Sequence, residues 1–224
     1  MSTTSFISHN IYEKLKEDIL TLQLKPGQVL SENETAKLYH ASRTPVHNAF
    51  AQLKAENLVD VLPQRGTLVS LLDWDYIQQI IYMRTQVEIA IFSDVIYNWK
   101  EELEQPITEN LNKQYEIIAD ETKLAEFYTL SNEFHEIFYD FVGKKKLWNA
   151  ITSLQHDYTR YRYLLYSVEQ RRLDMYHDHV NLFNLVRDKN VAAIHRFIPY
   201  HHPMSGDTFP TELEQYRDYF FKDT

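Results

Sequence analysis

Apolar residues recur at helical spacing near the start of the chain, and the pattern stops at a proline and a glycine. The spacing of Ile11, Leu15, Ile19 and Leu22 predicts an amphipathic helix over residues 11–22. Lys25-Pro26-Gly27 ends this helix, because a proline disfavours helical backbone at the residue before it and a glycine permits a turn. We therefore expect one helix and then a turn.

Two short helices are predicted directly after this turn. Ser31 is followed three residues later by Glu34, which is the capping-box signature of a helix that runs to Tyr39. Thr44 then predicts a second N-cap, with Pro45 at the first helical position and the helix continuing to about residue 56. Two short helices joined by a tight turn are typical of a helix-turn-helix.

A strand-turn-strand pattern follows the second short helix. Residues 58–62 and 67–70 are apolar and β-branched, and the turn residues 63–66 between them end in Arg65 and Gly66. A small hairpin with an Arg-Gly tip suits a wing that enters the minor groove of DNA, where the negative potential is concentrated. We expect a winged helix-turn-helix of three helices and a β-hairpin.

The rest of the chain is helical in pattern, and Gly143 is its clear internal stop. The predicted helices cover residues 76–99, 109–119, 123–142, 145–166, 171–187 and 191–198, with a loop at 203–210 and a short helix at 211–221. The fold class is therefore mainly α: a winged helix-turn-helix followed by an all-helical bundle that binds an effector. We expect a DNA-binding domain at 1–72, a linker at 73–76, the helical effector-binding and dimerisation domain at 77–204 and an extension at 205–224.

Charge is distributed unevenly along the 224 residues. Of 23 basic and 32 acidic residues, seven of each lie in residues 1–72, so the other 16 basic and 25 acidic residues carry the whole net charge of −9. DNA binding depends on lysine and arginine that neutralise phosphates. We therefore assign DNA binding to the neutral first third and expect tight binding only by a homodimer.

Composition excludes several other classes. The absence of cysteine excludes disulfides, thiolate zinc sites and cysteine nucleophiles, and four glycines argue against a glycine-rich phosphate loop. No apolar run approaches the length of a membrane span, and the polar N-terminus has no signal-peptide core. We expect a cytoplasmic protein without a membrane partner.

The first seventy residues resemble the winged helix-turn-helix of the GntR family of regulators. The resemblance rests on Leu24-Lys25-Pro26-Gly27, Leu30-Ser31-Glu32, Ser42-Arg43-Thr44-Pro45-Val46 and Gln64-Arg65-Gly66-Thr67. It implies double-stranded operator DNA as partner, with Arg43 on base edges, Thr44 beside a phosphate, and Arg65 and Gly66 at the wing tip. Ser42 and His47 complete the predicted DNA-binding residues. His47-Asn48 stands where the family usually has Arg-Glu, which implies a different operator or weaker binding.

Residues 76–202 resemble the helical effector domain called FCD. The matching residues are Met83-Arg84 with Glu88, Phe134-His135, His179 and His201. The resemblance implies that His135, His179 and His201 converge, and three imidazoles can hold a divalent metal such as zinc or nickel. Ser131, with Asn132 beside it, stands where metal-binding members carry an aspartate. Pro199 is expected to kink or end the last helix, which makes His202 an alternative to His201.

The same resemblance implies a small-molecule effector, commonly a carboxylate, bound by Arg84, Ser131, Asn132 and the three histidines. Arginine holds a carboxylate in bidentate geometry, and Arg160 and Arg162 are further candidate anchors. The histidines could instead line a metal-free pocket that binds an organic ligand directly.

The leading hypothesis is a ligand-responsive repressor or activator that binds a near-palindromic operator as a dimer. The alternative is a metal-dependent enzyme that uses the three histidines. A catalytic metal needs a nearby general base, and the sequence has no HExxH motif to supply one, so we do not expect an enzyme.

Overall fold

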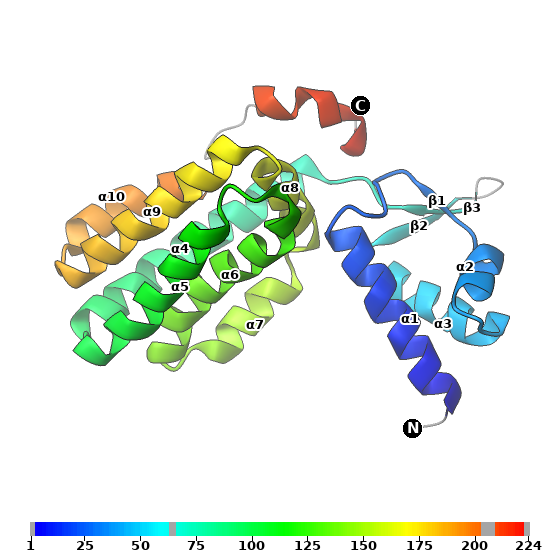
Figure 1. The fold of residues 1–224 in the computed structure, drawn as a ribbon, viewed down its shortest axis with the longest axis horizontal. Coiled ribbons are helices and arrows are strands. Elements are labelled where there is room, and N and C mark those ends of the chain that lie inside the picture. The colour runs from blue at the N-terminus through cyan, green and yellow to red at the C-terminus, as the bar shows by residue number, and fades with distance from the viewer. Residues whose placement is uncertain (1–2, 63–65, 203–208, 222–224) are drawn as a thin grey trace. The chain divides into compact units, whose positions relative to one another are not determined.

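The computed structural model describes residues 3–62, 66–202 and 209–221. The chain forms two compact units (Figure 1). Residues 1–74 and 215–224 make up the first, called here the N-terminal unit, and residues 75–214 make up the second, the helical unit. The observed architecture, mainly α with a small sheet in the N-terminal unit, confirms the predicted fold class.

Three helices build the core of the N-terminal unit: α1 (Thr3–Leu20), α2 (Glu32–Leu38) and α3 (Arg43–Ala55). Helix α3 packs against both α1 and α2. The apolar residues that the spacing picked out are buried together, namely Ile11, Leu15, Ile19, Val46, Ala49, Phe50 and Leu53. Burial of this apolar surface is what holds the three helices, since helices this short are marginal alone.

The helix starts are partly as predicted. Ser31 is the N-cap of α2, and its hydroxyl accepts a hydrogen bond from the Glu34 amide at 3.4 Å. The prediction of Thr44 as N-cap of α3 is wrong, because the helix begins at Arg43 with Ser42 as N-cap. Pro45 lies inside the first turn, where backbone N–H groups have no helical acceptor and a proline loses nothing.

A three-stranded antiparallel sheet completes the N-terminal unit. Strands β2 (Val59–Leu62) and β3 (Gly66–Val69) form the predicted hairpin, with Leu62 opposite Gly66. A third strand, β1 (Val29–Leu30), pairs with the other side of β3 and was not predicted. Two residues are too few for a sequence pattern, so only pairing with β3 defines this strand. The tip residue Arg65 lies outside the described residues.

The C-terminal segment returns to the N-terminal unit rather than standing apart. It forms a 3-10 helix, η3 (Thr211–Tyr219), where a short terminal helix was predicted. The Leu72 amide donates to Tyr219 O at 2.8 Å and the Phe221 amide donates to Leu72 O at 3.0 Å. These two hydrogen bonds pair the segment with the residues that lead into α4.

The helical unit consists of seven α-helices and two short 3-10 helices within the part of the chain that the structure describes. They are α4 (Trp74–Tyr97), η1 (Glu101–Leu103), α5 (Glu104–Ile117), η2 (Glu121–Lys123), α6 (Leu124–Phe141), α7 (Lys145–Ser153), α8 (His156–Tyr166), α9 (Glu169–Arg187) and α10 (Val191–His201). Helix α6 contacts α5, α7 and α8, and α9 contacts α5, α8 and α10. Aromatic side chains of α4 and α6 fill the centre, where Phe138 meets Phe92 and Phe134 edge-to-face.

One prediction about the helical unit is wrong, and of the second only the expected end of the last helix at Pro199 is wrong. The single helix expected over 145–166 is broken at Leu154 and Gln155, because the Gln155 side chain turns inward and accepts a hydrogen bond from Arg84 at 3.0 Å. Pro199 lies within α10 and does not end it before His201. A proline removes only one helical hydrogen bond, and packing of the apolar face of α10, with Ile194 and Ile198 fully buried, maintains the helix.

Within the described residues, no helix is both long enough and apolar enough to cross a bilayer.

Candidate functional sites in the two units

Helix α3 of the N-terminal unit has one buried and one exposed face. The buried face carries Val46, Ala49, Phe50 and Leu53. The predicted DNA-binding residues Ser42, Arg43, Thr44 and His47 are all exposed, and so is Gly66 in β3. Polar side chains at the exposed start of a helix are free to contact the edges of bases in a major groove.

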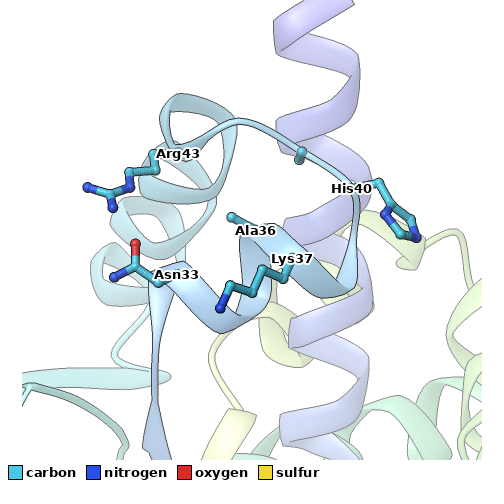
Figure 2. A pocket seen from close by; sticks show the side chains of 6 residues that line it. Asn33, Ala36, Lys37, His40 and Arg43 are labelled. Carbon is cyan, nitrogen blue, oxygen red and sulfur yellow. The ribbon is translucent and has the colours of Figure 1, made fainter.

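A basic hollow lies beside the start of α3. It is lined by Asn33, Ala36, Lys37, His40, Ala41 and Arg43. Figure 2 shows Asn33, Lys37 and Arg43 extending to the same side, whereas His40 points away from them. Sequence analysis missed Asn33 and Lys37, because they lie on α2 and only the packing of α2 against α3 brings them next to Arg43.

One acidic side chain limits the positive charge of this surface. Glu32 lies 3.0 Å from His47 Nδ1, so the His47 side chain already faces a carboxylate. Neither Arg43 nor Lys37 has a carboxylate within 4 Å among the described residues. Arg43 and Lys37 are therefore the available cations of this surface.

The helical unit brings its three predicted histidines together. His135 comes from α6, His179 from α9 and His201 from α10, and all three are buried. One ring nitrogen from each lies within 4.8 Å of the other two, and His135 Nε2 and His201 Nε2 are 3.2 Å apart. We call these residues the histidine cluster.

Neighbouring polar groups orient the rings of the histidine cluster. Gln114 donates its amide N–H to Asn110 at 2.6 Å, so its oxygen faces His179 Nδ1 at 2.9 Å and must accept the proton there. Consequently the lone pair of His179 resides on Nε2, which has no hydrogen-bond partner in the described part of the chain. His135 Nδ1 lies 3.3 Å from Glu88 Oε2, a charge contact without hydrogen-bond geometry.

His135, His179 and His202 are neutral at physiological pH, because burial lowers the pKa of each. Burial lowers the pKa of His135 to about 3 and that of His202 to about 4, although Glu88 acts against burial in both cases. Burial, and then the neighbouring His201 and His135, holds the pKa of His179 well below its ordinary value. Neutral imidazoles with inward lone pairs are the form that binds metal ions.

The donor set therefore fits a divalent metal held by three nitrogens. A tetrahedral ion with bonds of about 2.0–2.1 Å needs its ligand atoms roughly 3.3 Å apart, close to the separation of His135 and His201. A hydrogen bond at Nδ1 that leaves Nε2 free, as Gln114 makes to His179, is the usual outer shell of such sites. Ser131, one turn before His135, is fully buried and accepts a hydrogen bond from Arg162 Nη2 at 2.8 Å.

Arg84 is already paired inside the protein. Its Nη2 and Nε lie 2.7 and 3.1 Å from Glu88 Oε1, and both side chains are fully buried. The second oxygen of Glu88 lies 3.0 Å from His202 Nε2, so His202 faces Glu88, and the nitrogens that lie together are those of His135, His179 and His201. Arg84 therefore has a protein carboxylate where the sequence suggested an effector carboxylate.

Ser131 and Asn132 meet a different arginine. Arg162 on α8 donates to Ser131, to Asn132 Oδ1 at 2.6 Å, and to the Tyr166 hydroxyl at 2.9 and 3.1 Å. Arg160, the third candidate, pairs with Asp157. Sequence analysis missed Gln114 and Tyr166; the signal for Gln114 was a pair of amides four residues apart, Asn110 and Gln114, among the apolar residues of one helix.

Known proteins resemble this chain in both units. The profile described as "Bacterial regulatory proteins, gntR family" matches residues 7–69, and that of the FCD domain matches residues 79–202. The HTH-type transcriptional repressor RspR of Escherichia coli is 24% identical over 201 residues, covering 90% of this chain and 88% of that protein. Among solved structures, E. coli McbR/YncC has a TM-score of 0.67 at 18% identity, covering 90% of this chain and 94% of that one. A putative GntR regulator from Rhodococcus sp. RHA1 has a TM-score of 0.65 at 18% identity, covering 87% of this chain and 92% of that one.

Proposed function

Because this chain belongs to the GntR family of DNA-binding transcription regulators with a C-terminal FCD domain, we propose that it binds a near-palindromic operator as a homodimer and that a small molecule in the helical unit controls the binding. The family consists of transcription regulators and not of enzymes. The alternative of a metal-dependent enzyme is therefore not retained.

The observation that carries the DNA-binding part of the proposal is the exposed start of α3 beside the basic hollow. Arg43 is exposed and has no carboxylate partner in the described part of the chain, so its guanidinium is free to bind guanine O6 and N7. Lys37 on the adjacent α2 extends to the same side and suits a phosphate contact.

The balance of charge in the first 72 residues supports a dimer. The first 72 residues hold equal numbers of basic and acidic side chains, so a single copy gains little from phosphate neutralisation. Two copies related by two-fold symmetry double the base contacts and read an operator with matching symmetry. The relative RspR is a repressor, which supports repression by this chain too.

The effector would act by shifting a population. A ligand that binds one arrangement of the helical units more tightly favours that arrangement, and the spacing of the two recognition helices changes with it. We propose His135, His179 and His201 as ligands of zinc or nickel in this unit. When bound, the metal would offer open coordination positions to a carboxylate effector.

Replacement of Arg43 by alanine tests the DNA-binding proposal. Selection from random duplex DNA with the wild-type chain is expected to enrich an inverted repeat. Arg43→Ala is expected to lower affinity for that repeat by roughly 5- to 150-fold for each half-site, since a bidentate arginine-guanine contact contributes about 1–3 kcal/mol. Fluorescence anisotropy at fixed salt measures the loss. Arg187→Ala, a change at an exposed arginine of the helical unit, serves as the control for lost charge and should bind as the wild type does. Enrichment of no inverted repeat, or equal losses in the two variants, would contradict the proposal.

Metal content tests the histidine cluster. The purified, untagged chain is expected to hold one divalent ion, and at a free concentration 100 times Kd the ion would stabilise the fold by about 2.7 kcal/mol. His179→Ala should abolish stoichiometric metal in elemental analysis and the fall in Tm on chelation. His177→Ala, an exposed histidine two residues away on α9, should keep both. Wild-type protein that is metal-free and indifferent to chelators and to added zinc or nickel would reassign the histidines to lining an organic ligand pocket.

A further inference from the structure

Arg162 is a buried cation without a buried anion. Its side chain is only 3% exposed, and no carboxylate lies within 4 Å of it among the residues that the structure describes. Its neighbours are neutral: the Ser131 and Tyr166 hydroxyls and the Asn132 amide oxygen accept its hydrogen bonds. The rings of Tyr128, Tyr158 and Tyr166 lie 4.7, 5.7 and 5.2 Å from its guanidinium carbon.

The other buried arginines of the helical unit are compensated differently. Arg84 is paired with Glu88, and Arg160 is paired with Asp157. Arg172 donates to the carbonyls of Ile118 and Tyr166 at 2.7 and 2.6 Å, which are the last backbone acceptors at the ends of α5 and α8. A guanidinium there stabilises two helix C-termini, so Arg172 has a structural role. Arg162 has neither kind of partner.

An unpaired charge in a protein interior is strongly destabilising, and an arginine remains charged even there. Burial acts to lower the pKa of Arg162, but the Tyr166, Tyr128 and Tyr158 hydroxyls outweigh it and leave the pKa above its ordinary value. Glu88 is offset by Arg84 and Asp157 by Arg160, whereas the positive charge of Arg162 has no carboxylate within 4 Å in the described part of the chain. An anion bound there would remove this penalty.

One N–H group of the Arg162 guanidinium has no acceptor among the described residues. Arginine has five N–H groups, and Arg162 makes four hydrogen bonds, of which Nη1 makes one. That bond goes to Asn132, which is half-buried, whereas Ser131 and Tyr166 are fully buried. Nη1 is therefore the end of the guanidinium closest to solvent, and Asn132 is the group that an incoming ligand would displace.

The position of Arg162 relates it to the histidine cluster. Ser131, its partner on α6, lies four residues before His135 and so on the same face of that helix. A ligand on the Nη1 side would lie beside the cluster.

We propose that Arg162 is the anchor for the carboxylate group of the effector, with Asn132 moving aside so that the carboxylate accepts hydrogen bonds from Nη1 next to the histidine cluster. This assignment rests on the proposed effector-responsive function. Ser131 and Tyr166 already fix the position of the guanidinium, so ligand binding costs little side-chain conformational entropy.

Calorimetric titration of metal-free, full-length protein with sodium acetate and with sodium succinate tests the assignment. Acetamide serves as the uncharged probe, inorganic phosphate as the alternative anion, and sodium chloride keeps the ionic strength constant.

Three variants are titrated beside the wild type. Arg162→Met removes the cation. Asn132→Asp places a carboxylate within reach of Nη1, so the variant should gain Tm by about 2 °C or more while it blocks the site. Asn190→Asp adds the same charge at the exposed N-cap of α10 and is the matched control.

Both carboxylates are expected to bind the wild type and Asn190→Asp, and acetamide is not. Affinity should fall at least about tenfold in Arg162→Met and in Asn132→Asp, because a hydrogen-bonded charge pair contributes about 1.5–3 kcal/mol. Undiminished binding by folded Asn132→Asp, stronger binding of phosphate than of acetate or succinate, or no binding of either carboxylate to the wild type would overturn the assignment. Operator binding is measured on the same samples without added carboxylate, so that a failure of the Arg162 assignment can be distinguished from a failure of the proposed function. If the wild type binds its operator but one of these contrary results is found, only the role of Arg162 is rejected. If the wild type does not bind an operator, the proposed function itself is rejected.

Discussion

Replacement of Glu88 by alanine is expected to destabilise the helical unit by about 3–5 kcal/mol, the range for breaking a buried ion pair from one side. Arg84 would remain fully buried with Gln155 as its remaining polar partner among the contacts described above. The rings of Trp148 and Tyr158, whose centroids lie 5.3 and 5.4 Å from its guanidinium carbon, cannot replace a carboxylate. Urea unfolding followed by tryptophan fluorescence measures the loss, since Trp148 is buried in this unit.

Two further variants separate charge from packing in this experiment. The double variant Arg84→Met/Glu88→Ala removes both charges and is expected to regain most of the lost free energy of unfolding. Glu88→Gln keeps the shape and an acceptor but not the charge, and should lie between the wild type and Glu88→Ala. A double variant as unstable as Glu88→Ala would show that the loss arises from a cavity at residue 88, and would contradict the ion-pair explanation.

Mild acid is expected to destabilise the metal-free helical unit. The fold holds the pKa of His135 at about 3 and that of His202 at about 4, whereas an unfolded histidine has a pKa of about 6.5. Between pH 6.5 and about 4 the unfolded chain therefore binds protons that the folded chain does not, so stability is greatest above pH 6.5 and falls as the pH is lowered. At pH 5 the loss is about 2 kcal/mol for each of these histidines.

Urea unfolding at pH 7 and pH 5 measures this loss. His202→Gln keeps a hydrogen-bonding side chain near Glu88 but cannot take up a proton in this range. The difference in free energy of unfolding between the two pH values should therefore shrink by about 2 kcal/mol in this variant. A pH dependence identical to that of the wild type would mean that His202 is not a buried neutral histidine in solution.

Local signals in the sequence determined the winged helix-turn-helix. Helix starts, turns and the hairpin depend on neighbouring residues, such as the Ser31 cap, the Pro26-Gly27 turn and the strands on either side of residues 63–66. The helical character of the second half followed equally from the spacing of its apolar residues. What these signals missed was the strand Val29–Leu30, which exists only because it pairs with β3.

Tertiary structure alone decided the chemistry of the helical unit. The sequence named His135, His179, His201 and several arginines, but it could not say which neutral polar groups meet them, because those partners lie 31 to 71 residues apart along the chain. Packing buried the local pair Arg84–Glu88 and added Gln155 to it, at a break between α7 and α8 that the helical pattern did not reveal. Packing also extended α10 past Pro199 to His201 and left Arg162 with neutral partners. The spacing of apolar residues predicts which face of a helix is buried. The pairing of buried polar groups depends instead on how those faces pack in three dimensions.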